Sequence, residues 1–531
     1  MLLSPKLGRT CRGVLGNSLG AGLLFLFAVA FAAAPAGLLR ATDTTALTEA
    51  LNSIRANELR THVETLADDS YQGREAGTRG GRAAAEYLQQ HLVELGLRGA
   101  GDDGGYYQPF GSGCRNVLGL LEGSDPQLKK EIVLLGAHYD HVGYGNRETS
   151  RGPIGYIHNG ADDNASGVAG VLEAMDAFAD LAMAPKRSVL FALWDGEEKG
   201  VLGSRHFLAH TTVPFEKIVF SVDVDMIGRM KDHRMSVFGS RTGKGLRRLT
   251  AENNQASDLR LDFGWEMENN SDHYSFFARQ IPVLMFHTGS HDDLHRPSDD
   301  VDRINAEGME SAARLLFQVT CALANEAEIC RFRDDSRKET PTHKRRLEEL
   351  LPPQPPRLGV HWNTQSVDGG FVLTAVTPGS AAQRAGLLPG DRLFEFAGRP
   401  VSEPGQFRLD VLAARSPVTV VVHRPGDDQP LRLLVELDGL PTRLGISWRT
   451  DDAEPGTVIL TRVISGSPAQ RAGLCTGDRI YAVAGRSFAD SESFSRLVRL
   501  PPNPLELTIE REGRLDTIVL ELPPPEETQQ L

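Results

Sequence analysis

The chain has 531 residues, 40% of them apolar, which is too long for one ordinary domain and enough for more than one hydrophobic core. The formal net charge at pH 7 is -13, from 57 basic and 70 acidic residues. Because nucleic acids and anionic membrane surfaces repel an acidic chain, the charge argues against general binding to either of them.

The N-terminal segment has the pattern of an export signal. Basic residues precede an uncharged, mostly apolar stretch, and small residues lie near the end of that stretch. The basic residues are Lys6, Arg9 and Arg12, the uncharged stretch covers residues 13–39, and the small residues are Ala32, Ala34 and Ala36. We expect residues 1–40 to be a signal peptide, so that the protein is periplasmic or extracellular. The alternative is a retained membrane anchor, since the stretch is long enough to span a bilayer.

Short apolar segments alternate with segments of helical periodicity after this leader. The pattern predicts strands at residues 131–140, 187–195, 217–228 and 280–288, and helices at residues 45–67, 78–97, 165–182 and 304–327. Such alternation is typical of an α/β domain, here with a mostly parallel central sheet flanked by helices. We place this domain at residues 41–330.

The C-terminal part of the chain has a different texture. Residues 331–355 are charged and then Pro-rich, which predicts a linker. Beyond the linker the sequence repeats at a spacing of about 86 residues: "RLGVHW" returns as "RLGISW", and "SAAQRAGLLPGDRL" returns as "SPAQRAGLCTGDRI". Two small β-rich domains are therefore expected, at residues 356–438 and 439–524.

The five cysteines do not form the spacing pattern of a disulfide framework or of a zinc finger. Cys321 and Cys330 are close enough in sequence to pair, but two buried free thiols fit equally well. The cysteines therefore indicate no chemistry.

Acidic and imidazole side chains follow the predicted strands of the α/β domain. The five that stand out are His138 in "GAHYDH", Asp163 in "GADDNASG", Glu198 in "WDGEEKG", Asp225 in "VDVDMIG" and His295 in "DDLHRPSDD". Taken singly, a strand-end aspartate is usually a cap or a turn residue. Together they form the nitrogen and oxygen donor set that zinc prefers, whereas calcium and magnesium prefer oxygen alone.

A cation would also explain the three carboxylates of "WDGEEKG". Asp195, Glu197 and Glu198 lie within four positions at the end of an apolar strand, and like charges so close repel one another. Positive metal charge would offset that repulsion.

Residues 59–327 resemble the di-zinc aminopeptidase family, which also contains glutamate carboxypeptidase and the single-zinc glutaminyl cyclases. The resemblance rests on "HYDHVG", "GADDNASG", "WDGEEKGVLGS", "DMIG" and "HDDLHRPSDD", in the family's order, and on the lead-in "GREAGTRGGRAAAEYL". It implies two Zn²⁺ per chain and hydrolysis by a metal-activated water.

The resemblance also implies a role for each residue. Asp163 would bridge the two zinc ions, His138 and Asp225 would complete one site, and Glu198 and His295 would complete the other. Glu197 would be the general base, and Asp140 would orient His138. Asp162 and Asp223 compete with Asp163 and Asp225, and the family pattern selects the latter two. The remaining histidines of this region, namely His141, His158, His273, His287 and His291, are expected to face solvent or to support the ligands.

One position departs from the family pattern. Many relatives have a tyrosine directly before the last histidine ligand, and this chain has Leu294 there. Tyr139, Tyr274 and His291 are candidates to replace its hydroxyl; otherwise turnover depends more on the metals alone.

The two C-terminal repeats resemble PDZ domains. Leu358–Val360 and Leu444–Ile446 match the loop that binds a terminal carboxylate, which implies that C-terminal peptides are ligands. The alternative is that one or both domains serve as spacers packed on the peptidase.

These observations predict an exported zinc exopeptidase, with an aminopeptidase as the first choice. The alternatives are glutaminyl cyclase-like activity, a carboxypeptidase, or a non-catalytic peptide-binding protein. Peptides are the expected partners, with no nucleic acid, and with membrane contact only if residues 1–40 are retained. The insertion at residues 143–159 is expected either to line the mouth of the site or to be a stabilising surface loop.

Overall fold

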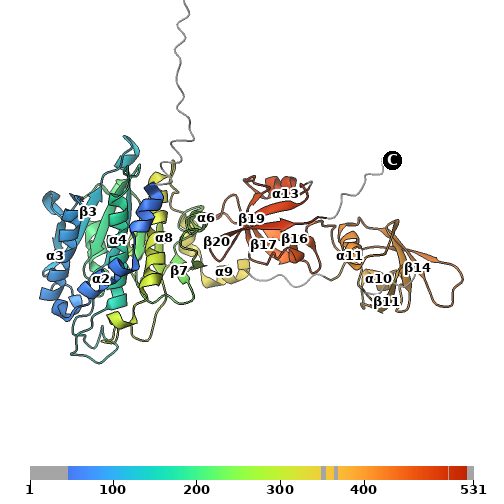
Figure 1. Cartoon of the computed structure of the whole chain (residues 1–531), viewed down its shortest axis with the longest axis horizontal. Helices are drawn as coiled ribbons and strands as arrows, with labels where there is room; N and C mark the ends of the chain where they lie inside the picture. Colours follow the sequence, from blue (N-terminus) through green and yellow to red (C-terminus); the bar gives the residue numbers. More distant parts are fainter. Residues whose placement is uncertain (1–45, 349–354, 364–368, 500, 523–531) are drawn as a thin grey trace, which may run out of the picture. The chain divides into compact units, whose positions relative to one another are not determined.

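The computed structural model describes residues 46–348, 355–363, 369–499 and 501–522 (Figure 1). The predicted signal peptide or anchor at residues 1–40 lies outside the described residues. Among the residues that are described, no helix is both long and apolar enough to span a membrane.

A nine-stranded mixed sheet forms the centre of the first domain, in the order β1-β3-β5-β4-β6-β9-β7-β8, with β2 paired to β3. The strands are β1 (Arg98–Gly99), β2 (Tyr107–Phe110), β3 (Cys114–Leu121), β4 (Ile132–His138), β5 (Ser188–Trp194), β6 (Ile218–Val224), β7 (Arg234–Phe238), β8 (Arg260–Phe263) and β9 (Val283–His287). The four central strands β5, β4, β6 and β9 run parallel, whereas β3 and β7 join them antiparallel. These four central strands are the four that the sequence predicts.

Helices cover both faces of this sheet. They are α2 (Ala56–Leu66), α3 (Arg79–Glu94), α4 (Gly167–Ala179), α5 (Leu202–Ala209), α6 (Leu246–Glu252), α7 (His273–Ala278) and α8 (Ala306–Asn325). Figure 1 shows α2, α3, α4 and α8, which cover one of the two faces. Alternate residues of β4 face opposite sides, as strand geometry requires. Val133 and Leu135 pack in the core shared with α2, α3, α4 and α8, while Leu134 packs in the core shared with α5 and α7. The predicted α/β fold is confirmed, and burial on both faces explains the continuous apolar strands.

The segment predicted as one helix over residues 45–67 is broken just before α2, because Arg55 has an extended backbone. The amide nitrogens of Arg55 and of the next residue donate to the carboxylates of Glu173 and Glu310. Arg314 donates to two backbone carbonyls on the other side of the break. Side chains from α4 and α8 thus satisfy the backbone groups that a continuous helix would have paired internally.

Two β-rich domains follow, as predicted. The sheet of the first contains β10 (Val360–Trp362), β11 (Phe371–Val376), β12 (Arg392–Phe396), β13 (Arg399–Pro400), β14 (Val418–His423) and β15 (Leu431–Val435), with helices α10 (Ala381–Arg384) and α11 (Pro404–Ala413). The sheet of the second contains β16 (Ile446–Arg449), β17 (Val458–Val463), β18 (Arg479–Val483), β19 (Leu505–Arg511) and β20 (Arg514–Leu520), with helices α12 (Pro468–Arg471) and α13 (Ser491–Arg499).

The sequence repeat reappears as the same turn in both β-rich domains. Gly359 and Gly445 have φ angles of +80° and +81°, and a Cβ atom at either position would overlap the side chain of Ser380 or Ser467. Only glycine fits a left-handed backbone at such close approach. The repeated "RLG" therefore encodes the same tight loop before edge strands β10 and β16.

The segment predicted as a linker contains ordered structure over its described residues. A short 3₁₀ turn (Asp334–Lys338) precedes α9 (Pro341–Glu348). Between them, Glu339 accepts two hydrogen bonds from the buried Arg241, at 2.7 and 2.8 Å. At least this part of the segment is therefore packed against the first domain.

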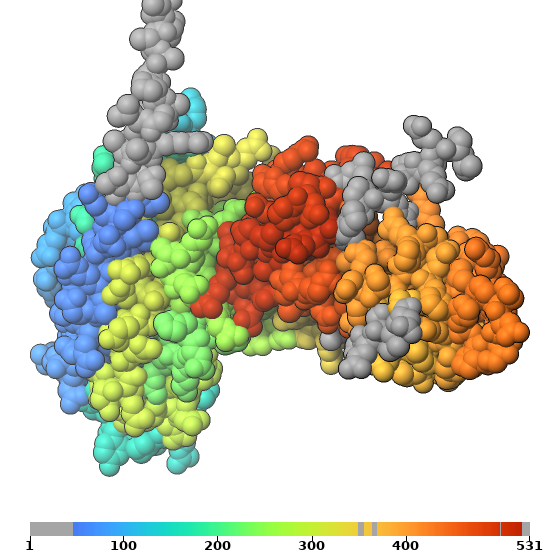
Figure 2. All heavy atoms as spheres, turned by 45° about the vertical axis from the view of Figure 1, so that its right-hand side comes forward, coloured from blue at the N-terminus to red at the C-terminus, as the bar shows by residue number. Residues whose placement is uncertain are grey.

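The β19–β20 hairpin of the second β-rich domain (red in Figures 1 and 2) contacts α6 and edge strand β8. The amide of Leu261 in β8 donates to the carbonyl of Glu512 at the hairpin tip, at 2.7 Å. Arg247 in α6 pairs with the buried carboxylate of Glu510 at 2.8 Å. This domain thus covers a sheet edge that would otherwise expose unpaired backbone groups.

Cys114, Cys321, Cys330 and Cys475 are all free thiols, so no disulfide joins Cys321 to Cys330 in the described structure.

Candidate metal centre

The carboxyl ends of the parallel strands bring the predicted ligands to one edge of the sheet. His138 is the last residue of β4, Glu198 follows β5, and Asp225 follows β6. Asp163 lies in the turn before α4, and His295 lies in the loop after β9. All five predicted metal ligands therefore meet in one place, where open α/β sheets bind their ligands.

Asp163 lies between two groups of side chains. Its Oδ1 atom is 3.5 Å from Nε2 of His138, and its Oδ2 atom is 3.1 Å from Nε2 of His295. One carboxylate thus offers one oxygen to each group, which is the arrangement a bridging ligand needs.

The first group contains His138, Asp163 and Asp225, all buried. Nε2 of His138 lies 3.4 Å from Oδ1 of Asp225. Nδ1 of the same ring lies 3.2 Å from the backbone carbonyl of Asp140 and 3.8 Å from its carboxylate. With the Nδ1 proton donated to the carbonyl, the Nε2 lone pair faces the two carboxylates. The residue predicted to orient His138 therefore makes its shortest contact through its backbone.

The second group contains Glu198 and two histidines. Nε2 of His295 lies 3.1 Å from Oε2 of Glu198, and Nδ1 of His295 lies 2.7 Å from the carbonyl of Thr149. His141 is fully buried, and its Nδ1 atom lies 2.7 Å from Oε1 of Glu198. The other ring nitrogen of His141 is buried without a hydrogen-bond partner.

The sequence left two roles open for His141, facing solvent or supporting the ligands. Its solvent-facing alternative is wrong, because the ring is buried and in contact with Glu198. The available signal was its place in "HYDH", only three residues after His138, but the family pattern assigns the ligand role to the first histidine alone.

The buried charges of this cluster favour a bound cation. Burial alone would raise the pKa of Glu198, but hydrogen bonds and positive charge from His141 and His295 lower it well below its usual range. Burial alone would lower the pKa of His138, but Asp225 and its neighbouring carboxylates raise it well above the ordinary value. Buried carboxylates thus need compensating positive charge here, and the nitrogen and oxygen donors suit zinc.

Glu197 stands beside these ligands. Its amide donates to Oδ1 of Asp140 at 3.0 Å, which fixes the loop after β5 against the loop after β4. Burial raises the pKa of the Glu197 carboxyl well above its ordinary value. A carboxylate with raised proton affinity beside a metal centre is suited to acid–base chemistry.

The two competing aspartates, Asp162 and Asp223, accept hydrogen bonds from backbone amides. Oδ1 of Asp162 accepts the amide of Gly228 at 2.6 Å, and Oδ2 of Asp223 accepts the amide of His273 at 3.1 Å. Asp163, by contrast, faces the two histidines predicted as ligands, His138 and His295. This placement favours the choice of Asp163 and Asp225 over their neighbours.

A buried network holds the turn that carries Asp163. The carboxylate of Asp299 accepts the amides of Asp162 and Asp163, at 3.1 and 3.0 Å. Oδ1 of Asn164 accepts the amide of Met226, which lies next to Asp225, at 3.0 Å. The turns that carry the two carboxylates are therefore tied to each other directly.

Arg74, from the lead-in "GREAGT", lies fully buried beneath this centre. Its guanidinium donates to four backbone carbonyls, namely those of Leu66, Tyr139, Asn159 and Gly160, at 2.6–2.9 Å. Burial lowers the pKa of Arg74 to about 10, although nearby carboxylates oppose that shift. The arginine thus joins the loop after β4 to the turn before α4.

The structure narrows the candidates to replace the hydroxyl missing at Leu294. The Tyr139 hydroxyl donates to the carbonyl of Arg115 at 2.7 Å, and the His291 ring lies 3.1 Å from Asp162. The Tyr139 hydroxyl is therefore engaged outside the two ligand groups, whereas neither ring nitrogen of His291 has a hydrogen-bond partner among the described residues. The third candidate, Tyr274, is partly buried and packs against Phe277.

Of the other histidines, His158 and His287 have hydrogen-bond partners, whereas Nδ1 of His273 has none among the described residues. His158 contacts Ser150 at 2.7 Å, His273 lies 3.7 Å from Asp223, and His287 accepts the amide of Gly289 at 2.6 Å.

Comparison with known proteins identifies this domain. Residues 116–320 match the model of peptidase family M28, and residues 372–424 and 459–511 match the PDZ domain model. The chain contains a peptidase family M28 domain and two PDZ domains. The predicted resemblance and the prediction of a zinc-dependent metallopeptidase are therefore confirmed.

Curated relatives match parts of the chain. "Probable leucine aminopeptidase 1" of Trichophyton verrucosum is 26% identical over 266 residues, which are 46% of this chain and 68% of that protein. "Leupeptin-inactivating enzyme 1" of Streptomyces exfoliatus is 26% identical over 208 residues, which are 38% of this chain and 43% of that protein. This chain therefore spans less than half the length of the Streptomyces relative.

Solved structures are also similar to this chain. The LapA aminopeptidase of Legionella pneumophila is 23% identical, covers 54% of this chain and 76% of its own, and has a TM-score of 0.45. An aminopeptidase from Aneurinibacillus sp. strain AM-1 is 16% identical, covers 52% of this chain and 96% of its own, and has a TM-score of 0.42.

In the M28 domain, the insertion at residues 143–159 packs against the loop that carries His295. The carbonyl of Thr149 contacts the His295 ring, and the amide of Arg151 donates to the His295 carbonyl at 3.0 Å. Tyr144 and Tyr156 of the same insertion are exposed. The insertion thus supports a ligand of the centre and also presents aromatic side chains to solvent.

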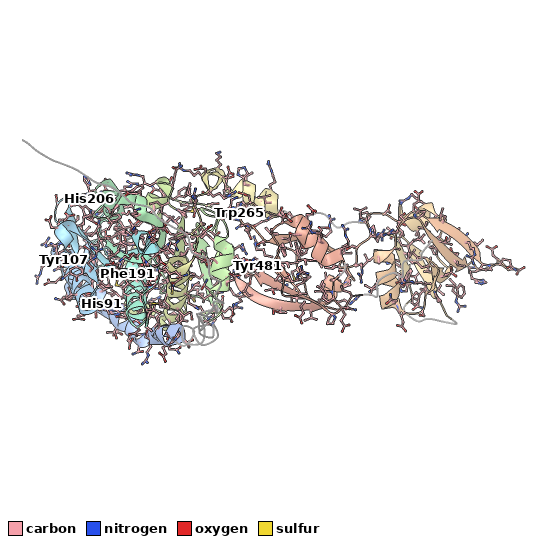
Figure 3. The ribbon with its side chains drawn as sticks, turned by 90° about the horizontal axis from the view of Figure 1, so that it is seen from above. His91, Tyr107, Phe191, His206, Trp265 and Tyr481 are labelled. Atoms are coloured by element: carbon pink, nitrogen blue, oxygen red, sulfur yellow. The ribbon has the colours of Figure 1, made fainter. Side chains whose placement is uncertain are left out.

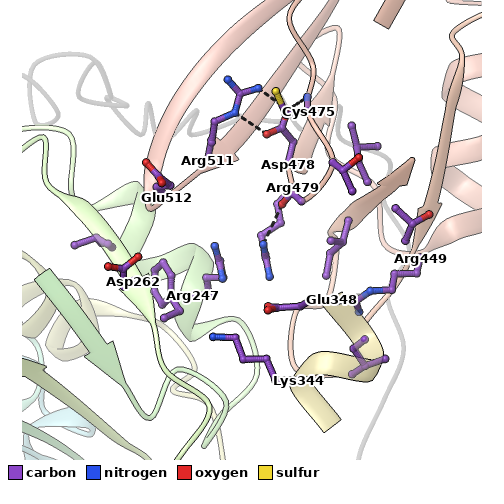
Figure 4. Close-up of a pocket in the computed structure, with 18 of the residues that line it drawn as sticks. Arg247, Asp262, Lys344, Glu348, Arg449, Cys475, Asp478, Arg479, Arg511 and Glu512 are labelled. Carbon is purple, nitrogen blue, oxygen red and sulfur yellow. Dashed lines mark hydrogen bonds and ion pairs between the residues drawn. The ribbon is translucent and has the colours of Figure 1, made fainter. Parts of the chain in front are cut away.

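A separate cavity of about 590 Å³ lies between the M28 domain and the second PDZ domain (Figure 4). Charged side chains line it, and some pair with each other, as Arg511 does with Asp478 at 2.7 Å. None of the predicted metal ligands is among its lining residues. It is therefore distinct from the candidate metal centre.

Proposed function

We propose that this chain is an exported di-zinc aminopeptidase that removes N-terminal residues from peptides, and that its PDZ domains bind the C-termini of substrates or partners. One observation carries the catalytic part of this proposal. The two carboxylate oxygens of Asp163 face two separate histidine–carboxylate groups, at 3.5 Å from His138 and 3.1 Å from His295. A single-metal centre would not need a carboxylate shared in this way.

The residues of each proposed site follow from the two groups. His138, Asp163 and Asp225 would hold one zinc ion, and Asp163, Glu198 and His295 would hold the other. Bound zinc lowers the pKa of a water molecule and polarises a substrate carbonyl. The contacts of the Nδ1 atoms with the carbonyls of Asp140 and Thr149 support Nε2 ligation by both histidines.

Glu197 is the proposed acid–base group. One Oε atom of its carboxylate accepts a proton from the attacking water and then delivers it to the nitrogen of the leaving amine. The raised pKa of Glu197 favours the proton-carrying state that this transfer requires. The hydrogen bond from the Glu197 amide to the Asp140 carboxylate holds Glu197 in a fixed position relative to His138.

The PDZ part of the proposal rests on edge strands β10 and β16, each of which lies at one end of its sheet. Each strand follows the glycine loop at Gly359 or Gly445, which matches a carboxylate-binding loop. An extended peptide adds to such an edge through backbone hydrogen bonds. Export rests on the composition of residues 1–40 alone.

Hydrolysis of leucyl-anilide and of its N-acetylated form tests the proposed activity, since several curated relatives are named leucine aminopeptidases. We expect the full chain to cleave only the substrate with a free amino group, and a chelator to abolish that cleavage until zinc is restored. Equal cleavage of both substrates, or cleavage that survives chelation, would contradict the proposal.

A further inference from the structure

A second cluster of imidazoles and carboxylates lies among helices α2, α3 and α4. His62 belongs to α2, His91 to α3, and Glu173 and Asp176 to α4. The two α4 residues are three positions apart, so both lie on one face of that helix. Three different helices therefore bring together side chains of the types that bind metals.

The donor atoms of this cluster are close together. One donor atom each from His62, His91 and Asp176 lie within 4.8 Å of one another. Nε2 of His91 is 3.3 Å from Oδ2 of Asp176, and Nε2 of His62 is 3.6 Å from Oε1 of Glu173. Zinc–ligand bonds of about 2.0–2.2 Å at tetrahedral angles place neighbouring ligand atoms roughly 3.3–3.6 Å apart, which is the spacing of these two contacts. Small side-chain shifts therefore suffice to bring all the donor atoms around one ion.

Hydrogen bonding leaves one ring nitrogen of the cluster without a partner. Nε2 of His91 is buried, yet it has no hydrogen-bond partner despite its nearness to Asp176. Nδ1 of His62 lies 2.6 Å from the Tyr87 hydroxyl. When Nδ1 of His62 carries the proton of this contact, the lone pair of Nε2 faces the carboxylate of Glu173. The nitrogen and the carboxylate oxygen, both electron-rich, then approach each other without a proton or cation between them.

We propose that His62, His91 and Asp176 bind a zinc ion outside the catalytic centre, with Glu173 within reach as a further ligand. Two imidazoles and one or two carboxylates form a donor set that zinc prefers to calcium or magnesium. The turn that carries Asp163 ends at residue 166, and Asp176 lies ten positions further on, which is about 15 Å along helix α4. This ion is therefore distinct from one held by Asp163. Figure 3 places His91 on the opposite side of the M28 domain from Trp265, away from the second PDZ domain.

Such an ion would clamp helices α2, α3 and α4 together at a distance from the turn that carries Asp163. Helix α4 begins directly after that turn, and α2 and α3 contribute one histidine each. Metal ligands from separate helices stabilise the fold, because zinc binds the folded arrangement and not the unfolded chain.

Zinc stoichiometry of the full chain tests this proposal. We expect the double variant His62→Gln/His91→Gln, equilibrated with zinc and dialysed, to hold one zinc per chain fewer than wild type, while it still hydrolyses leucyl-anilide. His206→Gln, which alters a histidine on α5, should match wild type. Equal zinc content in wild type and double variant would overturn the proposal.

Asp176→Asn provides an independent test that preserves side-chain volume. This variant should also lose one zinc, and added zinc should raise its Tm less than it raises the Tm of wild type. Apo-protein melting shows whether either variant folds. A variant that folds, binds as much zinc as wild type and gains as much Tm from it would show that the cluster is an ordinary polar network.

Discussion

Nδ1 of His141 lies 2.7 Å from Oε1 of Glu198, so a histidine outside the predicted ligand set contacts a proposed ligand directly. His295 approaches the same carboxylate from its other oxygen, at 3.1 Å. We infer different tasks for the two histidines: His295 binds metal, as proposed above, and His141 positions Glu198.

Substitution of each histidine separates these tasks. We expect His295→Gln to lose one zinc per chain. His141→Gln should keep its full zinc content at saturation but bind that zinc about 10–100-fold more weakly, as is usual when a residue that orients a metal ligand is removed. Zinc titration monitored by elemental analysis measures both. Loss of a full zinc from His141→Gln alone, with His295→Gln unaffected, would show that the roles are exchanged.

The insertion at residues 143–159 should affect zinc binding through the carbonyl of Thr149. Replacement of residues 146–151 by a short glycine link removes the acceptor of the His295 Nδ1 proton, and zinc affinity should fall about 10–100-fold. Glu148→Ala is the matched control, because it changes an exposed side chain and keeps the backbone. Unchanged affinity in the shortened variant would mean that the insertion does not hold His295.

Arg74 should be necessary for stability. Arg74→Ala leaves four buried carbonyls without their donor, and the free energy of unfolding should fall by roughly 3 kcal/mol or more. Arg79→Ala, which removes an exposed arginine nearby, should change it by less than about 0.5 kcal/mol. Chemical denaturation of zinc-saturated protein measures both, and similar values for the two variants would contradict the assigned role.

Acid should weaken the contact between the M28 domain and the second PDZ domain. Burial would raise the pKa of Asp451, but Arg241 at 2.9 Å lowers it to about 2. A depressed carboxyl pKa stabilises the folded protein above the unfolded value near pH 4, and this stability is lost as the pH falls toward 2. After allowance for solvent screening, the contribution is about 1–2 kcal/mol.

Calorimetry between pH 6 and pH 3 tests this coupling. The transition that reports the PDZ domain should move to lower temperature as the pH falls in wild type, and should move less in Asp451→Asn. Equal pH dependence in the two proteins would exclude Asp451 as the source.

Some features of the site were predictable from the sequence and others were not, and the difference has a physical cause. His138, Glu198 and Asp225 were predictable because a parallel sheet brings the ends of its strands together whatever the loops do. The position of His141 depends on how the chain turns after β4, and the contact between Thr149 and His295 joins residues 146 positions apart. Neither has a local pattern in the sequence.

The contact between the M28 domain and the second PDZ domain likewise has no local pattern in the sequence. Arg241 and Asp451 are 210 positions apart, and each looks like an ordinary surface charge in the sequence. Composition predicts a linker at residues 331–355, and it cannot show that Glu339 within that segment pairs with Arg241.

The variant Glu197→Gln tests the central claim most directly, because it removes the proposed proton carrier and leaves every proposed ligand in place. Zinc content and turnover of leucyl-anilide should be measured on the same preparation. We expect zinc content equal to wild type and a kcat lower by at least roughly 100-fold. Wild-type zinc with near-normal kcat would contradict the assignment of Glu197 as the general base.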